Sequence, residues 1–193
     1  NQDFKKFRDD FLKAIAEKDV SFLQNHLDQD IAFSFGAGPG IADFLKEWEL
    51  NSDPGNSLFW KEMKQVLLLG GSFTDADKAT FLAPYVTSKY PESLDAFEYV
   101  AVLGEKVNIF TEPDKSSPVK AQASWCLLKL AFWDGEQDKE AYDSTGRDFE
   151  KVTVSPGNYG YIEKKYIRSP IDYRASFQFK EGTWKMTFFV AGD

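Results

Sequence analysis

The chain of 193 residues contains one histidine, one cysteine and no long apolar run. With only His26 and Cys126 as nitrogen and sulfur ligands, it cannot assemble a metal site rich in those atoms, and we expect neither a metal nor another cofactor. A single cysteine excludes a disulfide within the chain, which fits a cytosolic protein or an exported one without disulfides. No apolar run approaches the roughly 20 residues that cross a bilayer, so no membrane span is expected.

An excess of basic residues is also lacking. The chain has 23 Lys and Arg against 31 Asp and Glu, a formal net charge of −8. Because phosphate recognition needs a basic face, this balance argues against a nucleic-acid partner and against an anionic membrane surface. Apolar residues make up 42% of the chain and include 18 Phe, enough for a packed core. The length allows one large domain or two small ones.

Residues suited to catalysis give no clear constellation. A cysteine nucleophile needs a base that produces the thiolate, whereas Cys126 falls in a strand predicted over 125–133, on an apolar side with Leu128 and Leu130. Carboxylates are plentiful, but the sequence does not show which of them converge in a pocket. The residues therefore favour a protein that is not an enzyme without settling the point.

Helical periodicity dominates the first part of the chain. Apolar residues at i, i+3 and i+4 predict helices, and alternation predicts a strand. Asp19 is the expected N-cap of the second helix. The loop 36–40 is interpreted as a turn, with a ligand cradle as the alternative. The expected elements are helices over 3–18 and 20–27, a strand over 31–35, and helices from Ile41, from Ser57 to Gly70 and from Thr74 to before Pro84.

From Phe97 onward the apolar period changes from helical to two. The last strands, over 171–179 and 184–190, flank the turn Lys180–Gly182 and form the clearest hairpin of the sequence. An isolated hairpin with such large apolar side chains is marginal in water. We therefore expect it to return and pair with the strand at 31–35, which gives an α+β fold.

Two stretches, V107-N-I-F-T-E-P-D-K-S-S-P-V119 and Y159-G-Y-I-E-K-K-Y-I167, resemble the first and last strands of a bacterial SH3-like domain. The resemblance implies an SH3-like barrel over residues 96–169. The part over 1–95 is then a separate α+β region, completed by residues 170–193.

The order of helix, short helix, aromatic strand, Gly/Pro loop and helix over 4–49, with a closing strand pair containing G182-T-W-K-M186, is similar to the cystatin-like cone of the nuclear-transport-factor superfamily. The strands expected between the third helix and the closing pair are not identifiable in the sequence. A cone of this kind can enclose a pocket, which we expect to be lined by Phe33, Phe35, Trp48, Phe177 and Trp184 if it is not filled by core packing.

The SH3-like resemblance implies a non-catalytic bacterial module that binds a peptide, a cell-wall fragment or a protein partner through aromatic residues. Bacterial SH3-like domains are mostly found outside the cytoplasm, and the chain begins at Asn1 without Met. Both observations favour an exported protein, periplasmic or at the cell surface, and a removed signal peptide is one explanation of the missing Met. The binding residues expected on the barrel are Phe110, Trp133, Tyr159, Tyr161 and Tyr166.

Two other functions stay open. In one, the cystatin-like part holds a small-molecule or enzymatic pocket and the barrel supports it. In the other, both parts serve only to associate with a partner protein. A concave pocket with converging polar groups near Phe33 and Phe177 distinguishes the first, and a flat apolar patch distinguishes the second.

Overall fold

The computed structural model describes residues 2–34, 40–134 and 148–192, and the chain divides into two compact units. The first unit comprises residues 1–89 and 171–193, and the second comprises residues 90–170. Each unit has its own cluster of buried apolar side chains. The chain combines helices with sheets whose strands pair mostly antiparallel, so the α+β class predicted from the sequence is confirmed.

The first unit contains a five-stranded sheet in the order β1-β12-β11-β3-β2. β12 runs parallel to β1 and antiparallel to β11, and β11 pairs antiparallel with β3. The predicted return of the terminal hairpin to the first strand is therefore present, but that strand begins earlier than the predicted range 31–35 and ends at Ala32. The strands are β1 (Leu27–Ala32), β2 (Ser72–Phe73), β3 (Thr80–Ala83), β11 (Arg174–Lys180) and β12 (Thr183–Val190).

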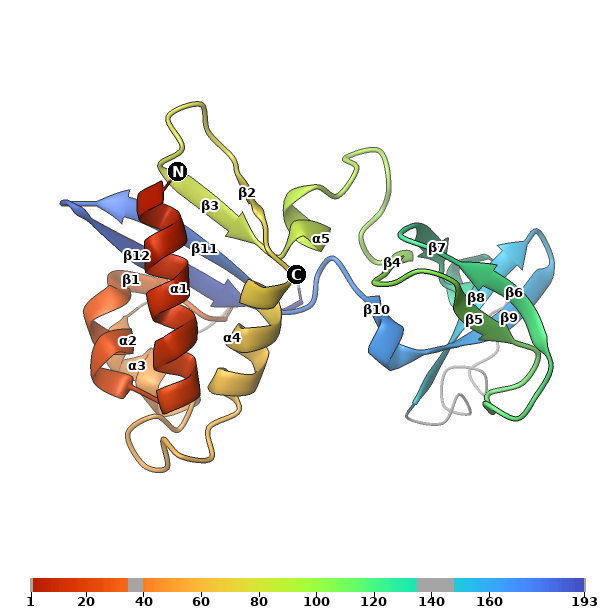
Figure 1. Cartoon of the computed structure of the whole chain (residues 1–193), viewed down its shortest axis with the longest axis horizontal. Coiled ribbons are helices and arrows are strands. Elements are labelled where there is room, and N and C mark those ends of the chain that lie inside the picture. The colour runs from red at the N-terminus through yellow and green to blue at the C-terminus, as the bar shows by residue number, and fades with distance from the viewer. Residues whose placement is uncertain (1, 35–39, 135–147, 193) are drawn as a thin grey trace. The chain divides into compact units, whose positions relative to one another are not determined.

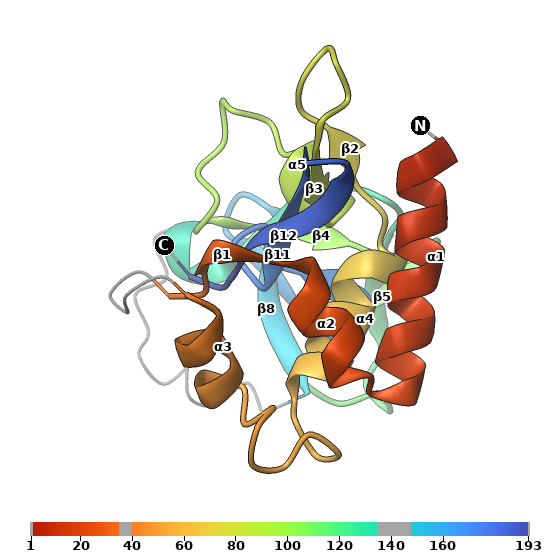
Figure 2. The ribbon, with the colours of Figure 1, turned by 90° about the vertical axis from the view of Figure 1, so that its left-hand side faces the viewer.

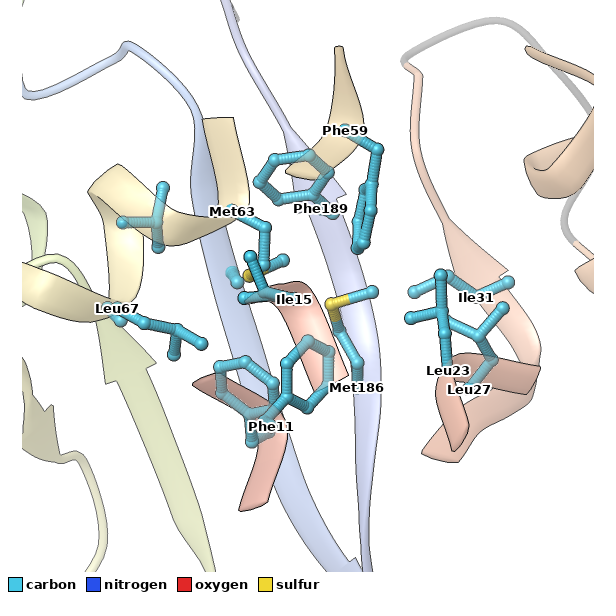
Figure 3. Packing of buried hydrophobic residues seen from close by; sticks show 14 of the residues in the cluster. Phe11, Ile15, Leu23, Leu27, Ile31, Phe59, Met63, Leu67, Met186 and Phe189 are labelled. Carbon is cyan, nitrogen blue, oxygen red and sulfur yellow. The ribbon is translucent and has the colours of Figure 1, made fainter. Parts of the chain in front are cut away.

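Four helices pack on one face of this sheet (Figures 1 and 2). Their apolar stripes meet the buried strand residues in a single core, part of which is shown in Figure 3. Asp19 caps α2 as predicted, since its Oδ1 accepts the Phe22 N–H at 2.9 Å. The helices are α1 (Gln2–Glu17), α2 (Val20–His26), α3 (Ile41–Glu47) and α4 (Phe59–Leu68), and a short α5 (Tyr85–Ser88) follows β3.

The helix predicted from Thr74 to before Pro84 is wrong. The segment forms the β2–β3 hairpin, in which the Thr74 N–H donates to the Thr80 carbonyl. Asp75 Oδ1 accepts the Ala79 N–H at 2.8 Å, so the acidic side chain closes a turn and does not cap a helix. These two strands supply the part of the sheet that was not identifiable in the sequence.

A bulge in β12 changes which aromatic residue is buried. The pairing steps from Ser176 opposite Phe188 to Phe177 opposite Met186, which leaves Thr187 as the extra residue. Strict alternation predicts that Phe188 follows Met186 into the core. Because the bulge reverses the alternation, Phe189 is fully buried instead.

Gly70 and Gly71, which follow α4, are needed for different reasons. Gly70 has φ +66°, the left-handed conformation that ends many helices and that the paired glycines predict. A Cβ on Gly71 would lie 2.2 Å from the Leu82 carbonyl oxygen and 3.0 Å from Ala83 Cα. Gly71 thus permits the chain leaving α4 to approach the backbone of β3.

The second unit contains two sheets, with the strand orders β10-β4-β7 and β6-β5-β9-β8. The closed barrel expected over residues 96–169 is not formed by the described strands, because only a single bridge between Leu130 and Val152 links β7 of one sheet to β8 of the other. Both sheets contribute to one core that includes Val100, Ile109 and Ile162. The strands are β4 (Tyr99–Val102), β5 (Val107–Phe110), β6 (Val119–Ala123), β7 (Leu127–Lys129), β8 (Phe149–Ser155), β9 (Asn158–Glu163) and β10 (Ile167–Arg168).

The strand predicted over 125–133 is shorter than expected. β7 covers Leu127–Lys129, and the 3-10 helix η1 (Ala131–Asp134) follows it. Trp125 has φ +47°, a left-handed conformation that interrupts strand geometry. Cys126 is consequently exposed and does not lie on the buried side that alternation predicts. The polar loop predicted beyond η1 lies largely outside the described residues.

Candidate functional site

A cavity of about 200 Å³ opens on the surface of the first unit. Its walls come from four places: the residue after β1, the end of α3, the residue before α4 and the approach to β11. The lining residues are Phe33, Glu47, Trp48, Glu49, Leu58 and Tyr173. Segments far apart in the sequence therefore converge here because the terminal hairpin joins the amino-terminal sheet.

Aromatic rings make up one part of the pocket wall and anchor it to the core. The Trp48 ring centroid lies 5.2 Å from that of Tyr173 and 5.2 Å from that of Phe189. Tyr173 stacks on Phe189 at 5.0 Å with 20° between the ring planes. Because Phe189 is fully buried, the two rings that reach the pocket are held by the core beneath them.

Carboxylates make up the other part of the pocket wall. Glu47 and Glu49 line the pocket and are exposed. Burial raises the pKa of the Tyr173 hydroxyl, and the negative charges of Glu62, Asp172 and Glu47 raise it further. Three carboxylates therefore lie close enough to the Tyr173 hydroxyl to disfavour its ionisation.

Two further features of the wall stand out. Glu49 has φ +54°, which is unusual for a residue with a side chain. Among the residues that the structure describes, no acceptor lies within hydrogen-bond distance of the buried Trp48 Nε1. This indole nitrogen is buried beneath the pocket wall and has no partner among the described residues.

The pocket expected between Phe33 and Phe177 is displaced from its predicted position. Phe177 is fully buried and Trp184 is 3% exposed, so both fill the core. Phe33 and Trp48 do line the cavity, whereas Phe35 lies outside the described residues, as does most of the loop 36–40. The cavity forms at the edge of the core, where Tyr173 takes the place predicted for Phe177.

A second cavity in the first unit, of about 300 Å³, is polar throughout most of its wall. Its lining includes Asp28 and Lys180, whose charged groups pair at 2.6 Å. Lys185 Nζ also donates to the Asn25 carbonyl at 2.6 Å. Asp28, Lys180 and Lys185 thus already have partners within the protein, and no aromatic ring is among the described lining residues, so the aromatic pocket is the better candidate.

In the ranges 2–34, 40–134 and 148–192, no three His, Cys, Asp or Glu side chains are grouped closely enough to hold a metal ion. His26 contacts the Phe22 carbonyl through Nδ1 at 2.8 Å and stacks on the Phe22 ring, which is a packing role. None of the helices over these ranges has the length and apolar character that crossing a membrane requires.

The structure brings together two of the binding residues predicted in the second unit. Tyr159 and Tyr161 are half-buried on the same side of β9, and Lys151 Nζ lies 5.4 and 5.9 Å from their ring centroids. Phe110 is 6% exposed and packs against Phe149, so it offers little surface.

The other two predicted residues belong to 3-10 helices. Tyr166 ends η2 (Lys164–Tyr166) and is 39% exposed, with Lys165 Nζ 4.7 Å from its ring centroid. The backbone of Trp133 lies in η1, and its side chain is outside what the structure describes.

The exposure of Trp125 in the second unit was not predicted from the sequence. The side chain of Trp125 is 61% exposed, while its backbone N–H donates to the Gly104 carbonyl. The strand pattern predicted over 125–133 concealed it, since a tryptophan at a strand end is usually half-buried. The left-handed backbone conformation of Trp125 cannot be predicted from the apolar pattern of the sequence.

Glu163 provides a pH-sensitive contact in the second unit. Its Oε1 lies 2.9 Å from Lys115 Nζ and 3.0 Å from Lys165 Nζ. Burial favours a higher pKa for Glu163, but hydrogen bonds and charge interactions with the two lysines outweigh it and lower the pKa.

We expect Glu163→Gln to lower the free energy of unfolding by about 1 kcal/mol at pH 7, because both lysines are largely exposed. A lowered folded-state pKa adds stability above the unfolded pKa of about 4.3, and that stability is lost as the pH falls through the folded pKa. Urea unfolding at pH 7, 5 and 3.5 should therefore show the difference shrinking with acidity, with the exposed Glu105→Gln as control. A difference that stays constant over this range would contradict the lysine contacts.

We compared the chain with models of protein families, with curated proteins and with solved structures. None of the three comparisons gave a match.

Proposed function

We propose that the first unit is a small-molecule-binding domain and that the pocket at Trp48 and Tyr173 is its binding site. The observation that carries this proposal is the pocket itself, in which rings fixed by the core meet exposed carboxylates. Binding sites are commonly concave, with an aromatic wall and a few polar groups that orient the ligand. The resemblance to a cystatin-like cone supports the same assignment.

The cavity volume limits the size of the ligand. Sites for drug-sized molecules occupy roughly 300–1,000 Å³, whereas this cavity measures about 200 Å³. The ligand enclosed is therefore a small molecule or one end group of a larger one. We assign no catalytic step to the pocket, since its lining offers two exposed glutamates and no activated nucleophile.

Filling the pocket from its rim tests the proposal without disturbing the core. Leu58 lines the pocket and is 67% exposed, while Leu68 on α4 is 64% exposed and is not a lining residue. We expect Leu58→Trp to weaken binding of small-molecule hits at least about tenfold, a loss of ~1.4 kcal/mol, and Leu68→Trp to leave it unchanged. Hits come from a ligand-observed NMR screen of small polar and charged compounds. A screen without hits, or hits that bind Leu58→Trp normally, would overturn the proposal.

We also propose, as a second candidate, that the second unit is a recognition module for a peptide or cell-wall fragment in an exported bacterial protein. The resemblance to SH3-like domains supports it, together with the Tyr159–Tyr161 pair and the exposed Trp125. Aromatic surfaces of this kind contribute to binding through their large contact area.

Co-sedimentation with purified cell wall tests this second candidate. We expect Tyr159→Ala and Trp125→Ala to reduce the bound fraction, and Val119→Ala, an exposed apolar control on β6, to leave it unchanged. Failure of the unsubstituted protein to sediment with the wall would remove the candidate and leave the pocket of the first unit unaffected.

A further inference from the structure

We propose that the pocket of the first unit takes a small organic cation, such as an alkylated ammonium group. This inference rests on the proposed function and adds the chemical class of the ligand. It follows from the coincidence, in one cavity, of aromatic rings and carboxylates with no basic side chain among the described lining residues.

The aromatic part of the wall fits an alkylated cation. The faces of Trp and Tyr rings carry negative partial charge and attract a cation within about 6 Å of the ring centroid. Phe33, Trp48 and Tyr173 come from three separate segments and border the same space. Alkyl groups on the cation would also bury apolar surface against these rings, which a strongly hydrated metal ion cannot do.

The charges around the pocket favour a cation over an anion. Glu47 and Glu49 line it, and the charges of Glu62 and Asp172 act on the Tyr173 hydroxyl. Nearby cations already face other groups: Lys61 Nζ lies 3.8 Å from Glu62, and Arg174 Nη1 donates to the Ile171 carbonyl at 3.0 Å. An anionic ligand entering here would meet repulsion without a compensating basic partner.

The size of the cavity agrees with a compact head group. A volume of about 200 Å³ holds a tetrahedral alkylammonium group with a short tail but not a large ring system. A larger ligand would place only its alkylammonium end in the cavity.

A pair of isosteres separates charge from shape. Choline and 3,3-dimethylbutan-1-ol have nearly the same shape and the same hydroxyl, but only choline is charged. In isothermal titration of the complete chain, we expect choline to bind at least about tenfold more tightly than the neutral alcohol. The double variant Glu47→Gln/Glu49→Gln should lower the ratio of choline affinity to alcohol affinity severalfold, because it removes charge while keeping shape. Glu17→Gln, an exposed position on α1 outside the pocket, is the matched control.

The two probes and the Leu58→Trp variant together distinguish the possible outcomes. Choline binding that exceeds alcohol binding, and that is lost in Leu58→Trp, supports the inference. Equal binding of the two probes overturns the cation assignment and leaves the proposed small-molecule function standing. Absence of choline binding overturns the inference too, and hits from other chemical classes that depend on Leu58 would then show that the pocket binds a different ligand. If neither the probes nor the library bind, both proposals fall.

Discussion

Replacing Phe177 with alanine is expected to lower the free energy of unfolding by about 3–5 kcal/mol, because the side chain is fully buried and a cavity would remain. The Phe177 ring lies 5.6 Å from Phe7 and 5.8 Å from Phe11, both on α1. This position joins the terminal hairpin to the first helix. A large loss would show that residues near the two ends of the chain share one core.

The control for Phe177 lies two residues further along the same strand. Phe179 is 47% exposed and its ring centroid lies 5.5 Å from that of Trp184, so Phe179→Ala should cost only about 1 kcal/mol. Urea unfolding, combined with hydrogen exchange of β1, β11 and β12 amides, measures both variants. Equal losses at the two positions would contradict the burial pattern of β11.

Ile162→Ala should destabilise the second unit by about 2–5 kcal/mol. Ile162 is fully buried on β9, where it pairs with Ile109 and packs in the core that both sheets share. Because the two units have separate cores, we expect hydrogen exchange to accelerate in β4–β9 while the slowest amides of the first unit keep their protection.

Val119→Ala on β6 is the matched control, since Val119 is 50% exposed. It should change the free energy of unfolding by no more than about 0.5 kcal/mol. Simultaneous loss of protection in both units after Ile162→Ala would show that they unfold as one body, which the two separate clusters do not predict.

The apolar periodicity of the sequence was sufficient to predict those helices and strands that have one strongly apolar side. The stripe of Phe4, Phe7, Phe11 and Ile15 predicts α1, and alternation around Lys180–Gly182 predicts the terminal hairpin, because burial dictates the spacing in both cases. The return of that hairpin to β1 followed from its excess of apolar surface. These predictions depend on local spacing and on burial, which a sequence displays directly.

Other features depend on local conformation, which spacing does not reveal. The bulge at Thr187 exchanges Phe188 for Phe189 in the core, and one extra residue in a strand has no apolar signature. Thr74 and Asp77 matched a helix cap, although Asp75 closes a hairpin turn. Short polar side chains accept backbone N–H groups in both settings, so the pattern alone does not distinguish them.

The candidate site was predicted only in outline. Phe33 and Trp48 were expected at a pocket, and both line it. Tyr173 and Leu58 were missed because their place depends on how the approach to β11 meets the start of α4, which is a long-range contact. In the second unit, the pairing of Tyr159 with Tyr161 follows from strand alternation, whereas the exposure of Trp125 follows from a backbone angle.

The most direct test of the binding pocket uses the indole N–H signals of the five tryptophans in a nitrogen-15 correlation spectrum. The Trp48 signal is assigned by its absence in Trp48→Phe. During titration with choline or with a hit from the small-molecule screen, the account predicts a progressive shift of the Trp48 signal while the Trp125 signal stays in place. A Trp48 signal that does not move while Trp125 shifts would contradict the account and place binding in the second unit.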